Sequence, residues 1–176
     1  MTPTAAVRTR PGFLDASDFA FTRDLERAWR DIRRELEAVP DDAFIEWPER
    51  FLYGHGWTVF GLHAFGKRID ENCARCPITT GLVESIPHMT TAGFSALAPE
   101  TRIAPHTGYT STVLRCHLGL VVPSGCGLRV GGETRTWEEG RCLVFDDTVR
   151  HDAWNDGTTR RVVLLVDFRR GQATRG

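Results

Sequence analysis

Two histidines in the second half of the sequence are candidate ligands for a catalytic metal. His106 follows Pro105, and His151 follows an acidic pair, Asp146 and Asp147, that is typical of a tight turn. An imidazole nitrogen binds iron, copper or zinc, and an iron oxygenase needs two or three protein ligands on one face of the metal. A single histidine is more often a polar surface or core residue. The chemistry therefore depends on whether the fold brings His106 and His151 together.

An arginine ten residues after His151 is a candidate anion-binding group. Arg161 begins an apolar run, residues 162–166, that has the composition of a buried strand. A charge at the head of a buried strand is costly unless it meets an anion. Because a guanidinium group pairs with a carboxylate through two parallel hydrogen bonds, Arg161 could clamp a carboxylate.

A second arginine lies in an alternating segment, residues 114–120. The leucines and Cys116 share one face of the expected strand, whereas Arg115, His117 and Gly119 share the other. A strand that carries Arg115 and His117 on one face is a candidate anion-binding wall. The alternation alone also allows a half-exposed edge strand.

The elements that would position these residues are a helix followed by short strands. From Asp18 to Val39, apolar residues recur every three or four positions, which predicts an amphipathic helix that Pro40 ends. After Pro48, short apolar runs lie between Gly, Pro and Asp clusters, which favours a sandwich or barrel over βαβ units. The predicted strands are Trp57–Phe65, Gly93–Leu97, Val113–Val122, Leu128–Gly131, Cys142–Phe145 and Arg161–Phe168.

This order of elements predicts a mainly β protein with N-terminal helices packed on a double-sheet barrel. Residues 1–16 have no periodicity and are predicted to be a mobile N-terminal segment. A length of 176 residues fits one domain, so we expect a single domain over residues 17–176.

The composition argues against several partners. The net charge is −1, so no global field attracts nucleic acid or acidic lipid. No stretch reaches the ~18 apolar residues of a membrane span, and no apolar region follows the first arginines as in a secretory signal. We therefore expect a cytoplasmic protein without nucleic-acid or membrane partners.

The five cysteines are predicted to be reduced thiols, because an odd number argues against a complete disulfide framework. Cys73 and Cys76, followed by Pro77, form half of a zinc or redox motif. A zinc site needs two more ligands at suitable spacing, and none is evident. A loop with two thiols is the simpler interpretation.

Together these residues resemble the aspartyl/asparaginyl β-hydroxylase family. The resemblance rests on five motifs in order and register, with Phe94-Ser95 matching further upstream. The motifs are Pro-His-Thr-Gly (105–108), Leu-Arg-Cys-His-Leu-Gly-Leu (114–120), Thr-Trp-Glu-Glu-Gly (136–140), Phe-Asp-Asp (145–147) and His151 with Arg161. The resemblance implies a double-stranded β-helix (a cupin-like jelly roll). It also implies an oxidoreductase, a dioxygenase that uses Fe(II), 2-oxoglutarate and O2 to hydroxylate its substrate.

The resemblance also implies roles for individual residues. His106 and His151 would be the catalytic iron ligands. The contacts to 2-oxoglutarate would come from Ser95, Arg115, His117 and Arg161. The acid that usually stands two residues after the first histidine is glycine in the aspartyl-hydroxylating branch, and it is Gly108 here. Gly108 therefore argues against the lipid-hydroxylating branch, which tends to keep the acid.

The substrate is the least determined feature. Family members that hydroxylate aspartyl side chains in proteins place basic residues where this chain has Gly93 and Val113, and they carry a helical-repeat region that is absent here. We expect a small-molecule, carrier-held or short-peptide substrate related to an aspartyl or asparaginyl unit, and the sequence does not indicate an oligomeric state. The alternative is a non-catalytic, cupin-like sensor of a metal or small ligand. A sensor would need no cosubstrate arginine, so Arg115 and Arg161 favour the enzyme.

Overall fold

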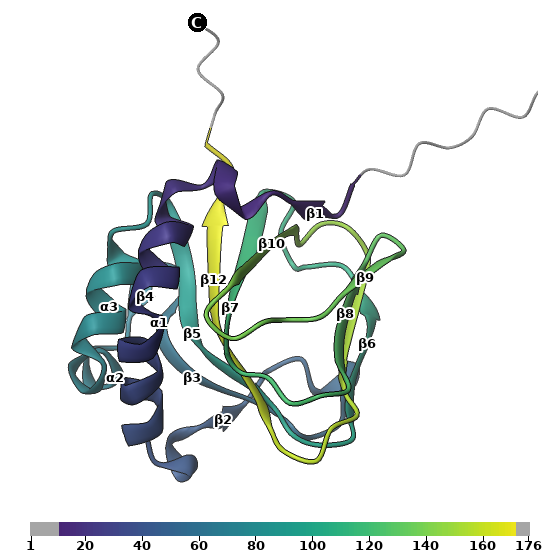
Figure 1. Cartoon of the computed structure of the whole chain (residues 1–176), viewed down its shortest axis with the longest axis horizontal. Coiled ribbons are helices and arrows are strands. Elements are labelled where there is room, and N and C mark those ends of the chain that lie inside the picture. The colour runs from purple at the N-terminus through teal and green to yellow at the C-terminus, as the bar shows by residue number, and fades with distance from the viewer. Residues whose placement is uncertain (1–10, 172–176) are drawn as a thin grey trace, which may run out of the picture.

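The computed structural model describes residues 11–171, in which two antiparallel β-sheets face each other and helices cover the outer side of the larger sheet (Figure 1). The strands are β1 (Phe13–Leu14), β2 (Ile45–Glu46), β3 (Trp57–Ala64), β4 (Lys67–Arg68), β5 (Met89–Leu97), β6 (Thr101–His106), β7 (Val113–Val121), β8 (Cys126–Val130), β9 (Glu133–Arg135), β10 (Cys142–Asp146), β11 (His151–Asn155) and β12 (Arg161–Arg169). Within the described residues the large sheet has the order β1-β10-β7-β12-β5-β3-β2, with β4 paired to β3. The small sheet has the order β6-β11-β8-β9.

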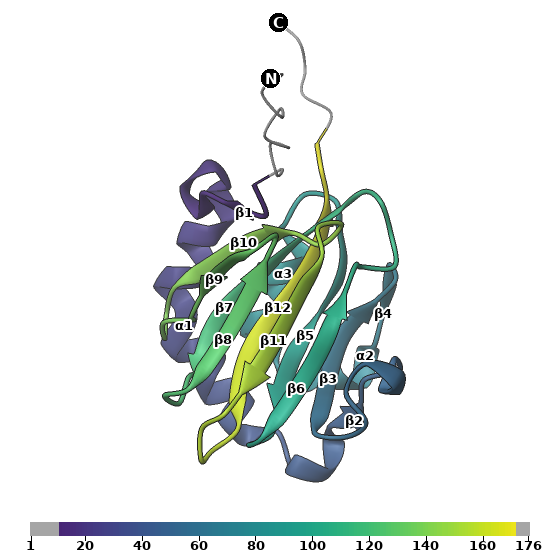
Figure 2. The same cartoon turned by 90° about the vertical axis from the view of Figure 1, so that its right-hand side faces the viewer.

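The chain from β5 to β12 winds back and forth between the two sheets. The large sheet contains β5, β7, β10 and β12, and the small sheet contains β6, β8, β9 and β11. Figure 2 shows this arrangement, with β8, β11 and β6 in front of β7, β12 and β5. This winding is that of a double-stranded β-helix, so the predicted jelly-roll fold is confirmed.

Three helices pack on the outer face of the large sheet (Figure 1). Helix α1 (Ala20–Ala38) buries Leu25, Ile32 and Leu36, which the sequence places on one helical face. This confirms the predicted N-terminal helix within two residues at its start and one at its end. Two shorter helices, α2 (Asp70–Arg75) and α3 (Pro77–Glu84), were not predicted. Short 3-10 turns are η1 (Ala16–Asp18), η2 (Asp41–Ala43) and η3 (Arg50–Leu52).

Strand β7 separates two hydrophobic cores. Its Leu114, Cys116, Leu118 and Leu120 belong to the core between the helices and the large sheet. A second core fills the space between the two sheets. The alternation predicted from the sequence is therefore confirmed. The alternative of a half-exposed edge strand is wrong, because β10 and β12 flank β7 on both sides.

The remaining sequence predictions differ in outcome. All six predicted strands are present, whereas β6, β11 and the short strands β1, β2, β4 and β9 were not predicted. Of the segment predicted to be mobile, residues 1–10 lie outside the described residues, and β1 already pairs with β10 through Phe13 and Phe145. All five cysteines are buried and free of disulfides. The Cys73–Cys76 segment is not a loop, because Cys73 lies in α2 and Cys76 immediately precedes α3.

Candidate active site

The six residues singled out from the sequence line one cavity between the two sheets. The large sheet contributes Ser95, Arg115, His117 and Arg161, and the small sheet contributes His106 and His151. Trp57, Trp137 and Phe145 complete much of the wall. The cavity measures only about 30 Å³, room for about one water molecule. A small organic ligand could enter only if side chains of this wall moved.

The two candidate metal ligands lie directly across from each other on neighbouring strands. His106 ends β6, His151 begins β11, and the two are register partners in the small sheet. Their ring centroids are 4.3 Å apart, at an interplanar angle of 58°. The fold therefore brings together two histidines that are far apart in the sequence.

The same local hydrogen bond orients both rings. The Nδ1 of His106 lies 2.8 Å from the carbonyl of Ala104, and the Nδ1 of His151 lies 2.8 Å from the carbonyl of Val149. Because a carbonyl only accepts, each Nδ1–H donates, and in the neutral ring Nε2 is then the nitrogen with a lone pair for a metal. This second hydrogen bond is the usual device that fixes a metal-binding imidazole.

Burial keeps His151 in the form that binds a metal. Its Nε2 is buried and has no hydrogen-bond partner in the described structure. Burial, together with the nearby His106 and Arg115, lowers the pKa of His151 to about 4, although the hydrogen bond to Val149 opposes the shift. The ring is therefore neutral at neutral pH, as metal coordination requires.

A carboxylate occupies the space beside Gly108. A Cβ atom built on Gly108 would collide with the Asp147 carboxylate, and the backbone N–H of Gly108 donates to the Asp147 carbonyl at 2.7 Å. The Asp147 Oδ1 lies 3.5 Å from the Nε2 of His151, and neither of its carboxylate oxygens has a hydrogen-bond partner in the described residues. The sequence motif contained Asp147, but no role for it was predicted.

Arg115 is held by two acidic residues. It donates to both carboxylate oxygens of Asp167, at 2.7 and 2.9 Å, and its Nη1 lies 3.3 Å from Asp147. Burial alone would lower the pKa of Arg115, but the charges of Asp167 and Asp147 outweigh it and raise the pKa. These three side chains sum to one negative charge, so a cation placed among them would be stabilised.

Arg161 differs from Arg115 because it has no acidic partner in the described residues. It is 2% exposed, and its Nε and Nη1 atoms have no hydrogen-bond partner. The indole of Trp137 lies 4.6 Å from the guanidinium carbon and provides a cation–π contact. Burial lowers the pKa of Arg161 to about 10. A buried, unpaired guanidinium of this kind is a site for an anion.

Two further polar groups share the cavity with Arg161. His117 receives a hydrogen bond at its Nδ1 from the indole N–H of Trp137, at 3.2 Å, while its Nε2 is buried without a partner. Burial and the neighbouring Arg161 and Arg115 hold the pKa of His117 well below its usual value. The hydroxyl of Ser95 accepts from the indole N–H of Trp57 at 3.0 Å, which leaves its own proton available for a ligand.

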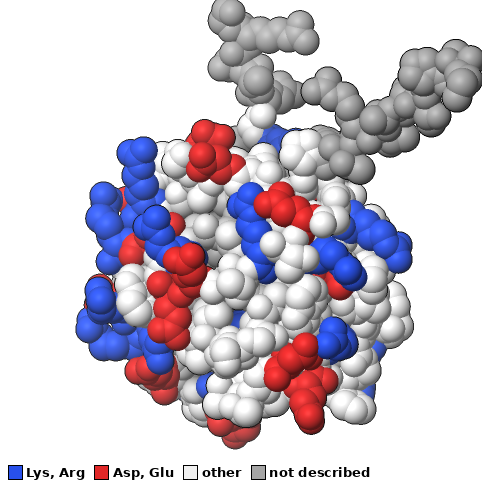
Figure 3. All heavy atoms as spheres, turned by 45° about the vertical axis from the view of Figure 1, so that its right-hand side comes forward, with Lys and Arg blue, Asp and Glu red and all other residues white. Residues whose placement is uncertain are grey.

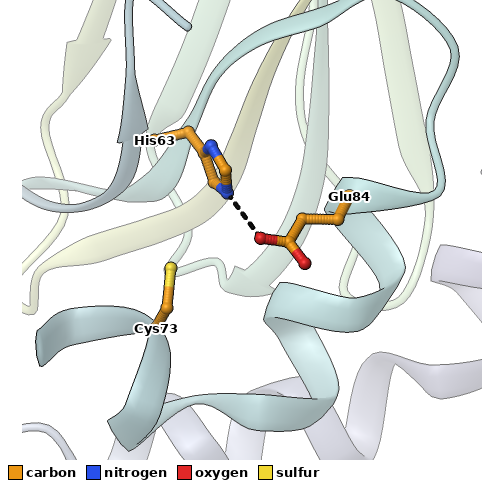
Figure 4. A group of neighbouring side chains, drawn as sticks. All are labelled: His63, Cys73 and Glu84. Carbon is orange, nitrogen blue, oxygen red and sulfur yellow. Dashed lines mark hydrogen bonds and ion pairs between the residues drawn. The ribbon is translucent and has the colours of Figure 1, made fainter. Parts of the chain in front are cut away.

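A second cluster of metal-binding residue types lies outside this cavity. Figure 4 shows His63, Cys73 and Glu84 converging from β3, α2 and α3, with ligand atoms within 4.8 Å of one another. Each already has a protein partner, because His63 and Arg68 both bond to Glu84 and the thiol of Cys73 donates to the Leu62 carbonyl. The positive charge of Arg68 also opposes a cation here. We therefore interpret the cluster as an ion pair that ties α3 to β3 and β4.

The surface carries no patch of one charge on the face drawn in Figure 3, where basic and acidic side chains lie close together. Most exposed arginines are paired, for example Arg129 with Asp152 and Arg102 with Asp156. Within residues 11–171, none of the helices has the length and apolar character that crossing a membrane requires.

A jelly roll that brings His106 beside the buried His151, with the unpaired Arg161 in the same cavity, defines a protein of the cupin-like fold class. The sequence profile of the family described as aspartyl/asparaginyl beta-hydroxylase matches residues 26–171, and the chain belongs to this family. The human aspartyl/asparaginyl beta-hydroxylase is 40% identical over 154 residues, which are 82% of this chain and 20% of that protein. The ornithine lipid ester-linked acyl 2-hydroxylase of Rhizobium tropici is 36% identical over 169 residues, 90% of this chain and 60% of that protein.

The chain thus spans between a fifth and three fifths of these relatives. Because one of them is named for a lipid, the expectation that membranes play no part has no support from the relatives. Among solved structures, a glyoxylate-induced protein of Pseudomonas aeruginosa matches with a TM-score of 0.52 and 7% identity, over 77% of this chain and 42% of that one. At this identity the likeness shows the fold alone.

Proposed function

We propose that this chain is an Fe(II)- and 2-oxoglutarate-dependent hydroxylase. The observation that carries the proposal is the unpaired guanidinium of Arg161, buried in the same cavity as His106 and His151. An uncompensated buried charge costs several kcal/mol, so such a group persists where a ligand supplies its partner. A dicarboxylate that reaches from Arg161 toward the histidine pair would match the chemistry at both ends of this cavity once side chains of its wall move.

The side chains of His106 and His151 would hold the iron through Nε2, because both Nδ1 atoms are already bonded to carbonyls. Two neutral imidazoles bring no charge, and the group of Arg115, Asp147 and Asp167 contributes one negative charge. This donor set suits a divalent cation. The carboxylate of Asp147, whose oxygens form no hydrogen bond in the described residues, would add its negative charge beside the metal.

The remaining cavity residues would position 2-oxoglutarate. Arg161 would pair with one carboxylate, and the Ser95 hydroxyl would donate to it. The Nε2 of His117 and the Nη1 of Arg115 would face the opposite end of the 2-oxoglutarate molecule. When bound, iron and 2-oxoglutarate supply the oxidising chemistry: O2 is consumed, 2-oxoglutarate becomes succinate and CO2, and one oxygen atom enters a substrate C–H bond.

A non-catalytic sensor of a metal or small ligand is the alternative. It would account for His106 and His151, but a metal sensor alone would not need Arg161. The buried, unpaired Arg161 therefore favours the enzyme.

The relatives' names give two substrate classes, an aspartyl or asparaginyl unit and the acyl chain of a lipid. Basic contacts to an aspartyl carboxylate are missing at two positions. Gly93 leaves no room for a side chain, because a Cβ would lie 2.6 Å from the Phe60 carbonyl oxygen, and Val113 is buried. An amino-acid-like, carrier-held or peptidic substrate would therefore need other groups of the site to neutralise its carboxylate.

The test is a three-component reconstitution under anaerobic conditions. The protein is loaded with Fe(II) and 2-oxoglutarate, then exposed to O2, and succinate is measured. We expect succinate only when all three are present, and none when glutarate replaces 2-oxoglutarate, because glutarate lacks the keto group. Absence of iron-dependent 2-oxoglutarate binding, together with absence of succinate, would refute the proposed function.

A further inference from the structure

An apolar groove adjoins the candidate active site. It has a volume of about 440 Å³ and lies along β2, β3 and β5, where the large sheet extends beyond the small one. Leu165 lines both this groove and the cavity that holds the histidine pair. The groove therefore adjoins, across the Leu165 side chain, the site where a substrate C–H bond would react.

Exposed hydrophobic side chains gather at this groove. Residues 11–171 contain five large hydrophobic residues that are exposed, and three of them line it: Ile45 at 66%, Phe65 at 68% and Tyr109 at 44%. Phe65 and Tyr109 pack edge to face, with ring centroids 5.2 Å apart. Phe65 also has a φ of +51°, which is unusual for a bulky residue. Clustered apolar surface of this kind marks a binding site.

The polar side chains of the groove are already bonded within the protein. Asn72 donates to the Gly61 carbonyl, and Thr91 accepts from the backbone N–H of Phe65. The partners of the other polar residues lie in the same way inside the protein: Glu84 for His63, Trp47 for Glu49 and Asp167 for Tyr109. The groove thus offers apolar contact and few hydrogen bonds. A peptide backbone would be poorly satisfied there, because its amides need partners when buried.

The charge of the groove excludes an acidic occupant as well. No lysine or arginine lines it in the described part of the chain, and its one carboxylate is Glu49. An anionic group in the groove would be desolvated without a counter-ion. A neutral aliphatic chain meets none of these costs.

Two stacked indoles connect the groove to the active-site cavity. Trp47 lines the groove and Trp57 lines the cavity, and their rings are 4.6 Å apart with an interplanar angle of 7°. The indole N–H of Trp57 bonds to Ser95, and the guanidinium of Arg115 lies 5.9 Å from the Trp47 ring. An occupant of the groove therefore touches the wall that positions the proposed 2-oxoglutarate contacts.

We propose that this groove binds the aliphatic chain of a single-chain amphiphile, and that this chain belongs to the substrate. The chain would lie between Ile45, Val59 and Phe65, and its inner end would reach the histidine pair past Leu165. This differs from the amino-acid or short-peptide substrate expected from the sequence. Because the groove adjoins the proposed iron site, the inference rests on the proposed function.

The test uses direct binding, so it does not depend on turnover. Metal-free protein is titrated with alkylphosphocholines of eight to fourteen carbons, kept below their micelle concentrations, and a chain-brominated analogue is used to quench tryptophan fluorescence at Trp47. We expect affinity to rise about fourfold for each added CH2 until the groove is full. Ile45→Glu and Phe65→Ser should each weaken binding at least tenfold.

Matched controls are the two exposed hydrophobic residues outside the groove. Ile78→Glu and Phe51→Ser should change affinity by less than twofold, since neither residue lines the groove. Equal affinity for all chain lengths, or equal losses in the groove and control variants, would overturn the proposal. So would a wild-type dimer that Ile45→Glu dissociates, because a second copy would then cover the groove.

The two proposals fail in different ways. Iron- and 2-oxoglutarate-dependent succinate formation by a protein that binds no alkyl chain would overturn the groove assignment and leave the reaction standing. Chain binding at Ile45 and Phe65 without 2-oxoglutarate binding would overturn the proposed function, and with it the claim that the chain belongs to a substrate.

Discussion

The carboxylate of Asp147 fills the space that a side chain at Gly108 would occupy. Gly108 lies two residues after His106, the position at which the resemblance places an iron-binding acid in other members of the superfamily. The acid is therefore present in space, although it comes from the turn between β10 and β11. It stands 3.5 Å from the Nε2 of His151 and 3.3 Å from Arg115. The site thus keeps a negative charge beside the histidine pair without a carboxylate at residue 108.

This relationship predicts a steric coupling between positions 108 and 147. Gly108→Ala should destabilise the protein by about 1–3 kcal/mol, because the new methyl group overlaps the Asp147 carboxylate. Asp147→Gly in the same chain should relieve most of that cost, so the two changes should be strongly non-additive. Urea unfolding of the wild type, both single variants and the double variant measures the coupling. Simple additivity would show that Asp147 lies elsewhere in solution.

The histidine pair predicts the location of the metal. His106→Ala or His151→Ala should abolish turnover and weaken Fe(II) binding at least a hundredfold, because each change leaves only one protein ligand for the metal. His63→Ala is the control, since His63 belongs to the other cluster with Cys73 and Glu84. It should leave Fe(II) affinity within a few-fold of wild type. Equilibrium dialysis against Fe(II) under anaerobic conditions gives these affinities, and a loss confined to His63→Ala would assign the metal to that cluster instead.

The sequence predicted the fold well where strands are buried on both faces. β12 carries a long apolar run, and β7 alternates apolar residues with Arg115 and His117, because each lies inside the large sheet between the helices and the small sheet. β6 and β11 were missed because polar and charged residues interrupt them, as in strands of a half-exposed sheet, so that neither strand shows an apolar run. Their register is nevertheless what places His106 beside His151.

The sequence predicted on which face of a strand a side chain lies better than it predicted which residue that side chain contacts. Alternation along residues 114–120 correctly placed Arg115 and His117 on the cavity side. It could not show that Asp167 already binds Arg115 while Arg161 has no such partner, because both facts depend on packing between strands. The contact between Gly108 and Asp147 and the apolar groove likewise arise from loops and edges that converge only in three dimensions.

Arg161 is expected to govern affinity for 2-oxoglutarate. Arg161→Ala should raise the 2-oxoglutarate concentration needed for half-maximal succinate formation by a hundredfold or more, since a buried charge pair loses one partner. Arg161→Lys should recover only part of the affinity, because an ammonium group cannot form two parallel hydrogen bonds with a carboxylate. Arg129→Ala, which removes an exposed arginine paired with Asp152, is the control and should behave as wild type. Unchanged dependence on 2-oxoglutarate in both Arg161 variants would remove it from the site.

Burial of His151 predicts an acid-sensitive fold when no metal is bound. Its pKa is lowered from 6.5 to about 4, so below pH 6.5 the unfolded chain takes up this proton before the folded chain does. Stability should therefore fall as the pH drops from 6.5 to 4, and His151 should account for roughly 3 kcal/mol of that loss. Urea unfolding at pH 7 and pH 4.5 should show a weaker pH dependence in His151→Gln than in wild type. His55→Gln, which changes an exposed histidine, should keep the wild-type dependence.

The two buried arginines predict stability changes of opposite sign. Arg161 has no acidic partner in the described residues, so Arg161→Met should raise the unfolding free energy of the ligand-free protein by about 1–3 kcal/mol. Arg115 is bound to Asp167 and faces Asp147, so Arg115→Met should lower it by about 3–5 kcal/mol, because two buried carboxylates lose their cation.

Ligand binding separates this effect from ordinary repacking. With Fe(II) present, 2-oxoglutarate at a hundred times its dissociation constant should stabilise the wild type by about 2.7 kcal/mol. The same concentration should leave Arg161→Met unchanged, because the group that binds the carboxylate is gone. Thermal and urea unfolding with and without 2-oxoglutarate measure both quantities. A destabilised Arg161→Met variant that still responds to 2-oxoglutarate would mean that Arg161 supports the barrel rather than the ligand.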